Sequence, residues 1–442
     1  MKKIIKYVIT FVFLIFAFNL LLLLGSLFPS SWIESHVKES SERLNLEGNL
    51  PLFSNYLSIT NNNYTDAIMI NECYSIDHTD PIFSYLSVRK NFKKGLTEKQ
   101  LEDTNGELIS ISSSSTEEVY DPVEELSEFL DGKVDTSIEY ARYWHGYLPF
   151  LRVLLIFFNI TEIRLILFAL FFILFIVLIV LLKKKLGNII SFIFAFSLLA
   201  YDYFFVSYSL ESSPIFLTMM LSCIILLIFI DKIKNIYLYL FIVACISNFV
   251  DFLTVPLITL AMPLYIYILY KQKQRNLEIK ESIKIVIGSC VAWGCGYAFT
   301  WLSKWVIYDI FYHKSLISSA LSQVLYRTTS TNYLTGNTIL GVLEFFLCNH
   351  LIYVTFFIWI ISIAFLLLLF YRKYSIHLQP NSFLDYLKRI IPILFVSILP
   401  IIWYMTLTNH TILHTHFVYR HMVILLIGNL ICFKKIFIIE KK

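Results

Sequence analysis

Charged residues are scarce in this sequence. Only 15% of its 442 residues are Asp, Glu, Lys or Arg, whereas 57% are hydrophobic, and the mean hydropathy is +0.68. A soluble domain has about 25% charged residues. The composition therefore excludes a soluble enzyme and predicts a polytopic membrane protein, with membrane lipid as a partner and no nucleic-acid partner.

Several motifs are absent as well. The sequence has no Walker motif, no GxGxxG and no HExxH, so ATP-driven transport is unsupported. No internal repeat is evident, which weakens the interpretation as a secondary transporter. Seven scattered cysteines give no disulfide framework and no zinc spacing. The pair His414 and His416 is weak evidence for a metal in a loop, and we expect neither metal nor other cofactor.

Long apolar runs divide the chain into candidate membrane spans. The first, Val8 to Phe28, is long enough to cross a bilayer and follows three lysines near the amino terminus. The other nine spans are predicted at about 162–182, 188–206, from Pro214 to the DKIK sequence, 236–250, 255–270, 284–302, 350–371, 390–408 and 417–433. Each predicted inner loop carries Lys or Arg, so the positive-inside rule predicts a multi-pass protein of the cell membrane with both termini cytoplasmic.

The longest polar segment separates the first two spans. We therefore expect three parts, namely a first transmembrane helix (1–28), a large mixed outer loop (29–146), and an interfacial helix with a nine-helix bundle (147–442). The loop holds 21 of the 32 acidic residues. Its stretch 93–135 is Ser-rich and acidic and is predicted to be mobile.

The polar loop changes to apolar sequence in the segment from Glu139 to Thr161. This segment is rich in aromatic residues with polar edges. Such side chains favour the membrane–water boundary. Val153–Phe158 is apolar but too short to span, which predicts a helix at the outer interface. Two interpretations stay open, an aromatic belt and a substrate-lining segment. The residues concerned are Arg142, Tyr143, Trp144, His145 and Arg152.

Ionisable residues recur at the outer ends of the predicted spans. Charges within spans are costly and usually face a bundle interior. Each one alone is explained by snorkelling or a salt bridge, but their common location on one side favours a functional site. These residues are Asp202, Glu211, Asp251, Lys304, His414, His416 and Arg420.

The order of these parts resembles the GT-C superfamily of membrane glycosyltransferases. Like those enzymes, the chain has a first helix, a long acidic outer loop, an interfacial helix and a bundle with polar groups facing out. The segments YWHGYLPFLR, SPIFL, DFLTVPL, GYAFTWLSKW and HTHFVYR are also similar to those of multispan membrane proteins of low-GC Gram-positive bacteria. The resemblance implies sugar transfer from a polyprenyl-phosphate donor to a cell-envelope glycan or lipid acceptor at the outer face.

It also implies roles for particular residues. An acid of the first outer loop acts as base in that family, and Asp66 or Glu72 in TDAIMINE match best, with Asp77 and Asp80 behind them. Basic residues hold the carrier phosphate, a role implied for Lys304, Arg327 and Arg420. Aromatic rings stack on sugar or hold lipid, a role implied for Tyr143, Trp144 and Trp301.

A second hypothesis is a non-catalytic transporter or binding protein for a lipid-linked glycan. It uses the same cations and requires no acid. A carboxylate close to the cations discriminates between the two, and we expect Asp66 and Arg420 to face one cavity.

Overall fold

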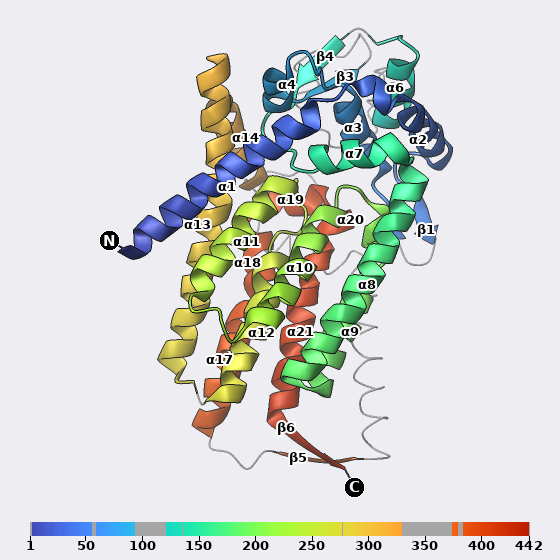
Figure 1. Ribbon diagram of the computed structural model, residues 1–442. Helices are drawn as coiled ribbons and strands as arrows, with labels where there is room; N and C mark the ends of the chain where they lie inside the picture. The colour runs from blue at the N-terminus through green and yellow to red at the C-terminus, as the bar shows by residue number, and fades with distance from the viewer. Residues whose placement is uncertain are drawn as a thin grey trace.

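The computed structural model describes residues 2–54, 59–92, 121–134, 136–275, 277–328, 374–378 and 383–441. These ranges form a helical bundle with a smaller cap of short helices and strands at one end (Figure 1). Within the described ranges, five helical stretches are long and apolar enough to cross a membrane: Ile4–Ser26, Ile160–Leu186, Ile279–Tyr312, Asp385–Thr406 and His416–Lys435. The mainly helical class with membrane-type helices is thus confirmed, whereas the number of ten spans stays a prediction.

The long helices match five of the predicted runs. They are α1 (Lys2–Ser26), α8 (Ile160–Leu186), α13 (Ile279–Tyr312), the consecutive pair α17 (Phe383–Ser397) and α18 (Leu399–Thr406), and α21 (Met422–Ile436). Short helices α19 (Thr408–Leu413) and α20 (Thr415–Val418) and the 3-10 turn η3 (Tyr419–His421) connect α18 to α21. The span predicted at 350–371 lies outside the described residues.

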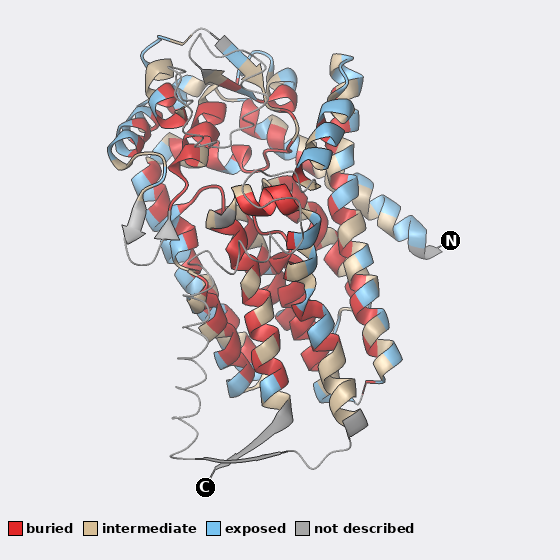
Figure 2. Ribbon diagram, turned by 180° about the vertical axis from the view of Figure 1, so that it is seen from behind, coloured by how far each residue is buried: buried red, intermediate tan, exposed pale blue. Residues whose placement is uncertain are grey.

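Four shorter helices of the described bundle lie close to their predicted positions. They are α9 (Asn188–Ala200), α10 (Ser213–Phe229), α11 (Ile236–Val250) and α12 (Ile258–Gln274), with the 3-10 turn η2 (Phe205–Tyr208) before α10. Every residue of α12 from Ile258 to Tyr270 is buried. A helix that is apolar on all sides belongs in the core. Figure 2 shows buried residues in the interior of the bundle and exposed residues on its outer faces, and many of the exposed side chains are large and apolar.

Helix α13 is longer than predicted. The predicted span ended at 302, followed by an outer loop from 303 to 349, but the helix continues to Tyr312 and a second helix, α14, covers Leu316–Thr328. The boundary at 302 was wrong because buried residues continue at helical spacing through Lys304, Trp305 and Tyr308. This extension of α13 reaches the cap.

The cap is the described part of residues 30–146. Its helices are η1 (Ser30–Trp32), α2 (Glu34–Glu47), α3 (Asn63–Tyr74), α4 (Pro81–Ser87) and α6 (Pro122–Leu130). Strands β1 (Leu52–Ser54) and β2 (Ile59–Thr60) pair antiparallel, as do β3 (Arg89–Phe92) and β4 (Thr136–Glu139). Helix α3 is almost completely buried at the centre of the cap.

Helix α6 corrects the prediction that residues 93–135 are mobile. Residues 93–120 lie outside the described ranges, but Pro122–Leu130 form an ordered helix that contacts α2 and α3. Val123 and Leu126 are buried, and the Asp121 side chain accepts the N–H of Val123 at 3.0 Å as an N-cap. Apolar residues three positions apart behind an Asp–Pro start specify a helix that the acidic composition concealed.

Helix α7 (Leu148–Phe157) lies across the bundle beneath the cap (Figure 1). The predicted interfacial segment is therefore helical. Its Arg152 is completely buried and donates to the carbonyl oxygens of Gly25 at 2.9 Å, Phe28 at 2.7 Å and Cys73. A guanidinium has five donors in a fixed fork, so one side chain can fasten α1, α3 and α7 together.

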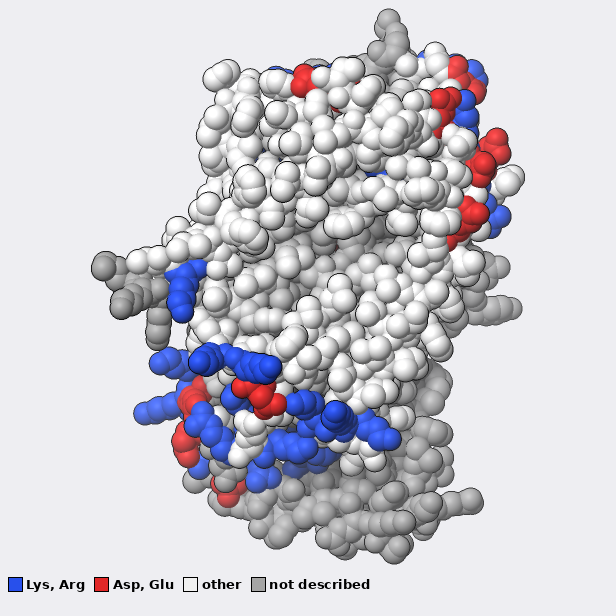
Figure 3. All heavy atoms as spheres, in the orientation of Figure 1, with Lys and Arg blue, Asp and Glu red and all other residues white. Residues whose placement is uncertain are grey.

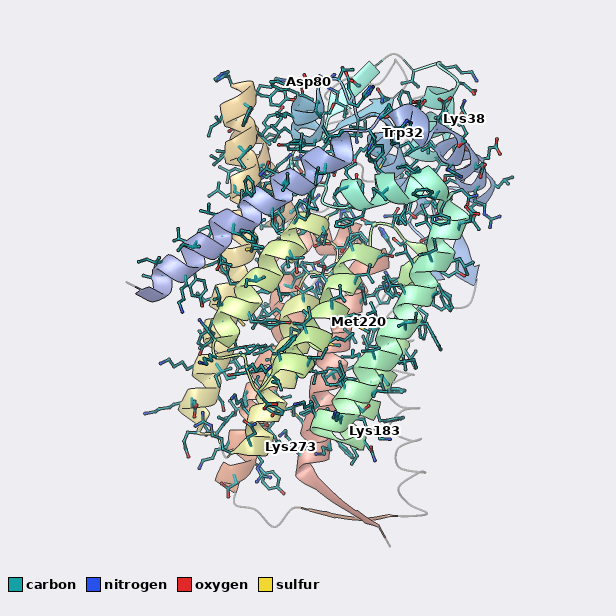
Figure 4. All side chains as sticks on the ribbon, in the orientation of Figure 1. Trp32, Lys38, Asp80, Lys183, Met220 and Lys273 are labelled. Carbon is teal, nitrogen blue, oxygen red and sulfur yellow. The ribbon has the colours of Figure 1, made fainter. Side chains whose placement is uncertain are left out.

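Lys and Arg gather at the end of the bundle opposite the cap (Figure 3). Strands β5 (Tyr374–Leu378) and β6 (Phe437–Lys441) pair antiparallel at this basic end. Figure 4 shows Lys183 and Lys273 there, whereas Trp32, Lys38 and Asp80 belong to the cap and Met220 to the bundle between. The two ends thus differ in charge as the predicted topology requires, and the orientation in the membrane stays a prediction.

Candidate functional site

Helix α3 carries two predicted acids, Asp66 and Glu72, into the protein interior. The Asn62 side chain starts the helix by accepting the N–H of Thr65 at 3.2 Å. Both carboxylates are completely buried, whereas the alternatives Asp77 and Asp80 are exposed. A buried carboxylate is stable only with hydrogen bonds or a cation nearby.

Asp66 has both kinds of partner. One carboxylate oxygen accepts the backbone N–H groups of Leu210 at 2.9 Å and Glu211 at 3.4 Å. The other lies 3.2 Å from Nη2 of Arg164. Burial nevertheless dominates over the attraction to Arg164 and raises the pKa of Asp66 to about 6.

Arg164, in the first turns of α8, was not among the site residues predicted from the sequence. Its guanidinium also donates to Glu47 at 2.8 Å and to Asn63 at 2.7 Å, so it joins α2, α3 and α8. Its position as an arginine inside an apolar run is the sequence feature that could have identified it. The same feature did identify Arg420.

Glu211 lies next to Asp66 in the connection before α10. It is buried, and its Oε2 accepts a hydrogen bond from Nδ2 of Asn62 at 2.7 Å. The same Nδ2 atom lies 3.4 Å from Nε2 of His416. Burial and the nearby charges of Asp66 and Asp251 raise the pKa of Glu211 to about 8, and Arg420 opposes this shift.

Arg420 approaches the same group from η3. It is 5% exposed, and its charge acts on both Glu211 and Asp202. Among the described residues its Nε atom has no hydrogen-bond partner, and its Nη1 lies 3.4 Å from the His416 carbonyl oxygen. Asp202 accepts a hydrogen bond from Tyr419. The charges of Arg420 and Asp66 therefore both act on Glu211, and the shared cavity stays a prediction.

Asp251 occupies the tight connection between α11 and α12. Its carboxylate accepts the Thr254 N–H at 3.0 Å and the Tyr297 hydroxyl at 3.2 Å. Burial raises its pKa to about 6. We call Asp66, Glu211 and Asp251, with Arg164 and Arg420, the carboxylate site.

Histidines lie beside this connection. Nε2 of His410 is 2.9 Å from the Leu253 carbonyl oxygen, and Nδ1 contacts Arg327 of α14. His410 was not among the predicted residues. The rings of His410 and His414 are 4.7 Å apart, and His414 stacks on Phe417. Burial and His414 lower the pKa of His410, which keeps it neutral.

Glu72 belongs to a separate group under β3 and β4. It accepts a hydrogen bond from the Tyr147 hydroxyl, and its Oε2 lies 3.1 Å from Nδ1 of His145. Lys90 is buried there, with its ammonium 5.1 Å from the ring centre of Tyr140. Burial lowers the pKa of Lys90 to about 8. Predicted Glu72 and His145 therefore come together, with contacts that differ from those of Asp66.

Of the predicted aromatic residues, Tyr143 and Trp144 are buried between cap and bundle, and Trp301 is half-buried. Tyr143 stacks on Trp301 at 5.7 Å between ring centres. Trp144 donates its N–H to the Thr300 carbonyl at 2.7 Å, and Trp301 donates to the backbone carbonyl of Arg142 at 2.8 Å. These contacts place the rings inside the molecule rather than on its outer face. A role in lining a substrate site stays a prediction.

Lys304 joins the same interface. Its ammonium is completely buried and donates to the carbonyl oxygens of Leu86 at 2.8 Å and Tyr85 at 3.2 Å. Like Arg152, it binds backbone carbonyls, in this case those of the cap. We therefore leave both residues out of the proposed donor site.

A cavity of about 420 Å³ opens beside Arg164 at the junction of cap and bundle. Arg43, Glu47 and Asn61 line it from the cap, and Thr161, Leu165 and Tyr208 line it from the bundle side. Its size is in the range of small-ligand sites. Arg164 therefore contacts both the cavity and Asp66. Within the described ranges, no group of three His, Cys, Asp or Glu side chains is arranged to hold a metal ion.

No protein-family model, no characterised protein and no solved structure matches this chain. Its function is inferred from the contacts and charges of its own residues.

Proposed function

We propose that this protein is a membrane-embedded transferase that moves a sugar from a polyprenyl-phosphate donor to an acceptor hydroxyl at the outer face. The carboxylate site is the observation that carries this proposal. Asp66 and Arg164 form a buried ion pair, and the buried Glu211 is affected by the charges of Asp66, Asp251 and Arg420. Such groups are costly to bury and cluster at functional sites. The layout of the chain, which resembles the GT-C superfamily, supports the reaction class.

The reaction needs a base and a cation. The bond between sugar C1 and the donor phosphate oxygen breaks, and the electron pair leaves with the phosphate. The acceptor oxygen bonds to C1, and its proton passes to a carboxylate. Asp66 suits this role because a pKa of about 6 leaves it mostly ionised at neutral pH. Arg420 suits the departing phosphate because charge-assisted hydrogen bonds stabilise the developing negative charge.

Glu211 has a complementary role in this proposal. With a pKa of about 8 it is mostly protonated at neutral pH, so it can donate a hydrogen bond. Its backbone N–H binds Asp66 and its carboxyl is affected by the charge of Arg420, which suits a contact to the acceptor or to the donor phosphate. The cavity beside Arg164 supports access from the membrane, because Leu165 belongs to the apolar run of α8.

One observation favours the second hypothesis, a non-catalytic protein that binds or transports a lipid-linked glycan. Both oxygens of Asp66 already have partners, namely Arg164 and the N–H groups of Leu210 and Glu211. A base must have a lone pair directed at the substrate. In the second hypothesis Asp66 holds the cap on the bundle, and Arg420 alone contacts the phosphate.

The test uses purified protein in lipid nanodiscs with a panel of radiolabelled polyprenyl-phosphate sugars. We expect Asp66→Asn to abolish turnover and to leave donor binding intact. Arg420→Gln should weaken donor binding at least tenfold. The control is Asp77→Asn, which changes an exposed acid of the same cap and should change neither quantity.

Full turnover in Asp66→Asn would reject Asp66 as base. Wild-type protein that binds the lipid-linked sugars but turns over none of them would support the second hypothesis. Thermal unfolding of each variant separates a loss of fold from a loss of chemistry.

A further inference from the structure

A second, larger cavity lies at the basic end of the bundle, away from the carboxylate site. Its volume is about 560 Å³, and it lies between α12, α17 and the end of α21. Its lining includes one acid, Asp385, and six cationic residues. We call it the basic pocket; the cations are Lys273, Arg275, Lys388, Arg389, Lys434 and Lys435.

Among the described side chains, three acids lie at or beside the six cations of the pocket, namely Asp385, Glu281 and Glu278. Glu281 pairs with Arg275, and Glu278 lies 3.6 Å from Lys388. Lys435 instead donates to a neutral group, the side-chain amide of Gln272, at 2.6 Å. Lys434 and Lys435 repel each other and are both repelled by Arg389. Like charges held this close destabilise the folded state, and a further anion among them would lower that cost.

The positive-inside rule explains why basic residues occur at this end (Figure 3), but not why they surround one cavity. The cations come from three separate helices, as Lys273, Lys388 and Lys434 illustrate. Elsewhere at the same end, Lys183 and Lys184 are exposed and do not line the pocket. The arrangement in the pocket is therefore more specific than a basic surface.

Four aliphatic side chains line the pocket as well, beside the polar Gln272. They are Leu186, Ile190, Leu269 and Leu277. Cations beside aliphatic side chains match the two parts of a phospholipid, the phosphate and the start of its acyl chains. A soluble phosphate compound shares only the first part.

We propose that the basic pocket binds the phosphate of an anionic membrane lipid. This site is independent of the proposed transferase activity, because it lies at the other end of the bundle and shares no residue with the carboxylate site. A bound lipid would neutralise the excess positive charge and fasten α12, α17 and α21 together.

The test is native mass spectrometry of the full-length protein after exchange into detergent containing phosphatidylglycerol or phosphatidylcholine. We expect wild-type protein to retain phosphatidylglycerol, and the double variant Lys434→Gln/Lys435→Gln to lose at least fivefold in retention. The control is Lys183→Gln/Lys184→Gln, which removes the same charge from the same end outside the pocket. It should retain the lipid like the wild type.

Thermal unfolding with and without phosphatidylglycerol gives a second measurement. Lys388→Gln replaces the double variant if the latter fails to fold, and Lys434→Arg/Lys435→Arg should retain binding. Equal loss in the pocket and control variants, or no loss in either, would overturn the proposal. If millimolar pyrophosphate displaced the bound phosphatidylglycerol, the lipid assignment would be overturned. The pocket would then be assigned to a soluble phosphate compound.

Discussion

The carboxylate of Asp66 accepts the backbone N–H of Leu210 at 2.9 Å, across 144 positions of sequence. Through this bond and the ion pair to Arg164, helix α3 of the cap is attached to two different parts of the bundle. The carboxylate site therefore depends on the docking of cap and bundle. Variants of its residues have to be tested for stability as well as for function.

The buried carboxylates predict how stability changes with pH. Folding raises the pKa of Glu211 from 4.5 to about 8, and burial raises those of Asp66 and Asp251 to about 6. The native state then binds more protons than the unfolded state, so the free energy of unfolding falls as pH rises. This contribution is complete below about pH 4 and is lost by about pH 8.

Glu211→Gln should remove the part of this dependence that lies between about pH 6 and 8. The measurement is the thermal unfolding midpoint of the purified protein at pH 5, 6, 7 and 8. Glu124→Gln, at an exposed position of α6, should leave the profile unchanged. A Glu211→Gln profile that still falls steeply from pH 6 to 8 would assign the titration to another group.

Arg164 should be a strong determinant of stability. Arg164→Gln leaves Asp66 and Glu47 without their buried cation, and breaking a buried pair costs about 3–5 kcal/mol. The side chain of Arg164 is 5% exposed, whereas that of Arg43, which also pairs with Glu47, is 52% exposed. Arg43→Gln should therefore cost only about 0.2–1 kcal/mol. Equal effects of the two variants in denaturant unfolding would contradict a buried role for Arg164.

Lys304 should stabilise the cap rather than bind donor. Lys304→Met leaves the carbonyls of Tyr85 and Leu86 without a donor, and unsatisfied buried groups cost about 1–3 kcal/mol. We expect a lower unfolding midpoint and unchanged donor binding well below that midpoint. The control is Lys314→Met, at an exposed position between α13 and α14. Lost donor binding at unchanged stability would return Lys304 to the phosphate site.

Two glycines of α13 should respond differently to alanine. A Cβ on Gly296 would lie 2.6 Å from the carbonyl oxygen of Phe241, whereas a Cβ on Gly294 meets nothing within 4 Å. Gly296→Ala should separate α13 from α11 and cost about 1–3 kcal/mol. Gly294→Ala should be neutral or slightly stabilising. Unfolding midpoints in one detergent measure both, and a neutral Gly296→Ala would contradict the close approach of the two helices.

The predicted topology places the cap and the basic end on opposite sides of the membrane. Asp131→Cys in the cap and Lys184→Cys at the basic end both introduce an exposed thiol. A membrane-impermeant maleimide should label Asp131→Cys in intact cells and Lys184→Cys only after permeabilisation. The wild-type chain controls for labelling of the native cysteines. Labelling of both positions from one side would reject the topology.

Helix positions could be predicted where apolar runs have clear boundaries. Helix α11 begins and ends at the predicted 236 and 250, and the side chain of Asn235 caps its start. The prediction failed for α6, because an acidic composition concealed a short buried helix. It also failed at the end of α13, where the tertiary contact with the cap extends the helix beyond the apolar run.

For the candidate site, the sequence predicts only which charged residues are buried, and not which groups they contact. A charge within an apolar run indicates a buried partner, and this holds for Arg420, Arg152 and Lys304. The sequence does not show whether that partner is a carboxylate or a backbone carbonyl, because this depends on which segments meet in space. Arg420 lies near Glu211, whereas Lys304 faces two carbonyls of the cap.

The bonds of Arg152 have a consequence for biogenesis. The carbonyls that it binds, those of Gly25, Phe28 and Cys73, all precede it in the chain. They have already left the ribosome when Arg152 is synthesised, so this attachment of α1, α3 and α7 requires no residue of the later bundle. The membrane insertion machinery could therefore receive α8 and the following helices next to a partly assembled amino-terminal unit. Translation arrested just beyond α7 should already give this unit protection from protease, and Arg152→Gln should remove it.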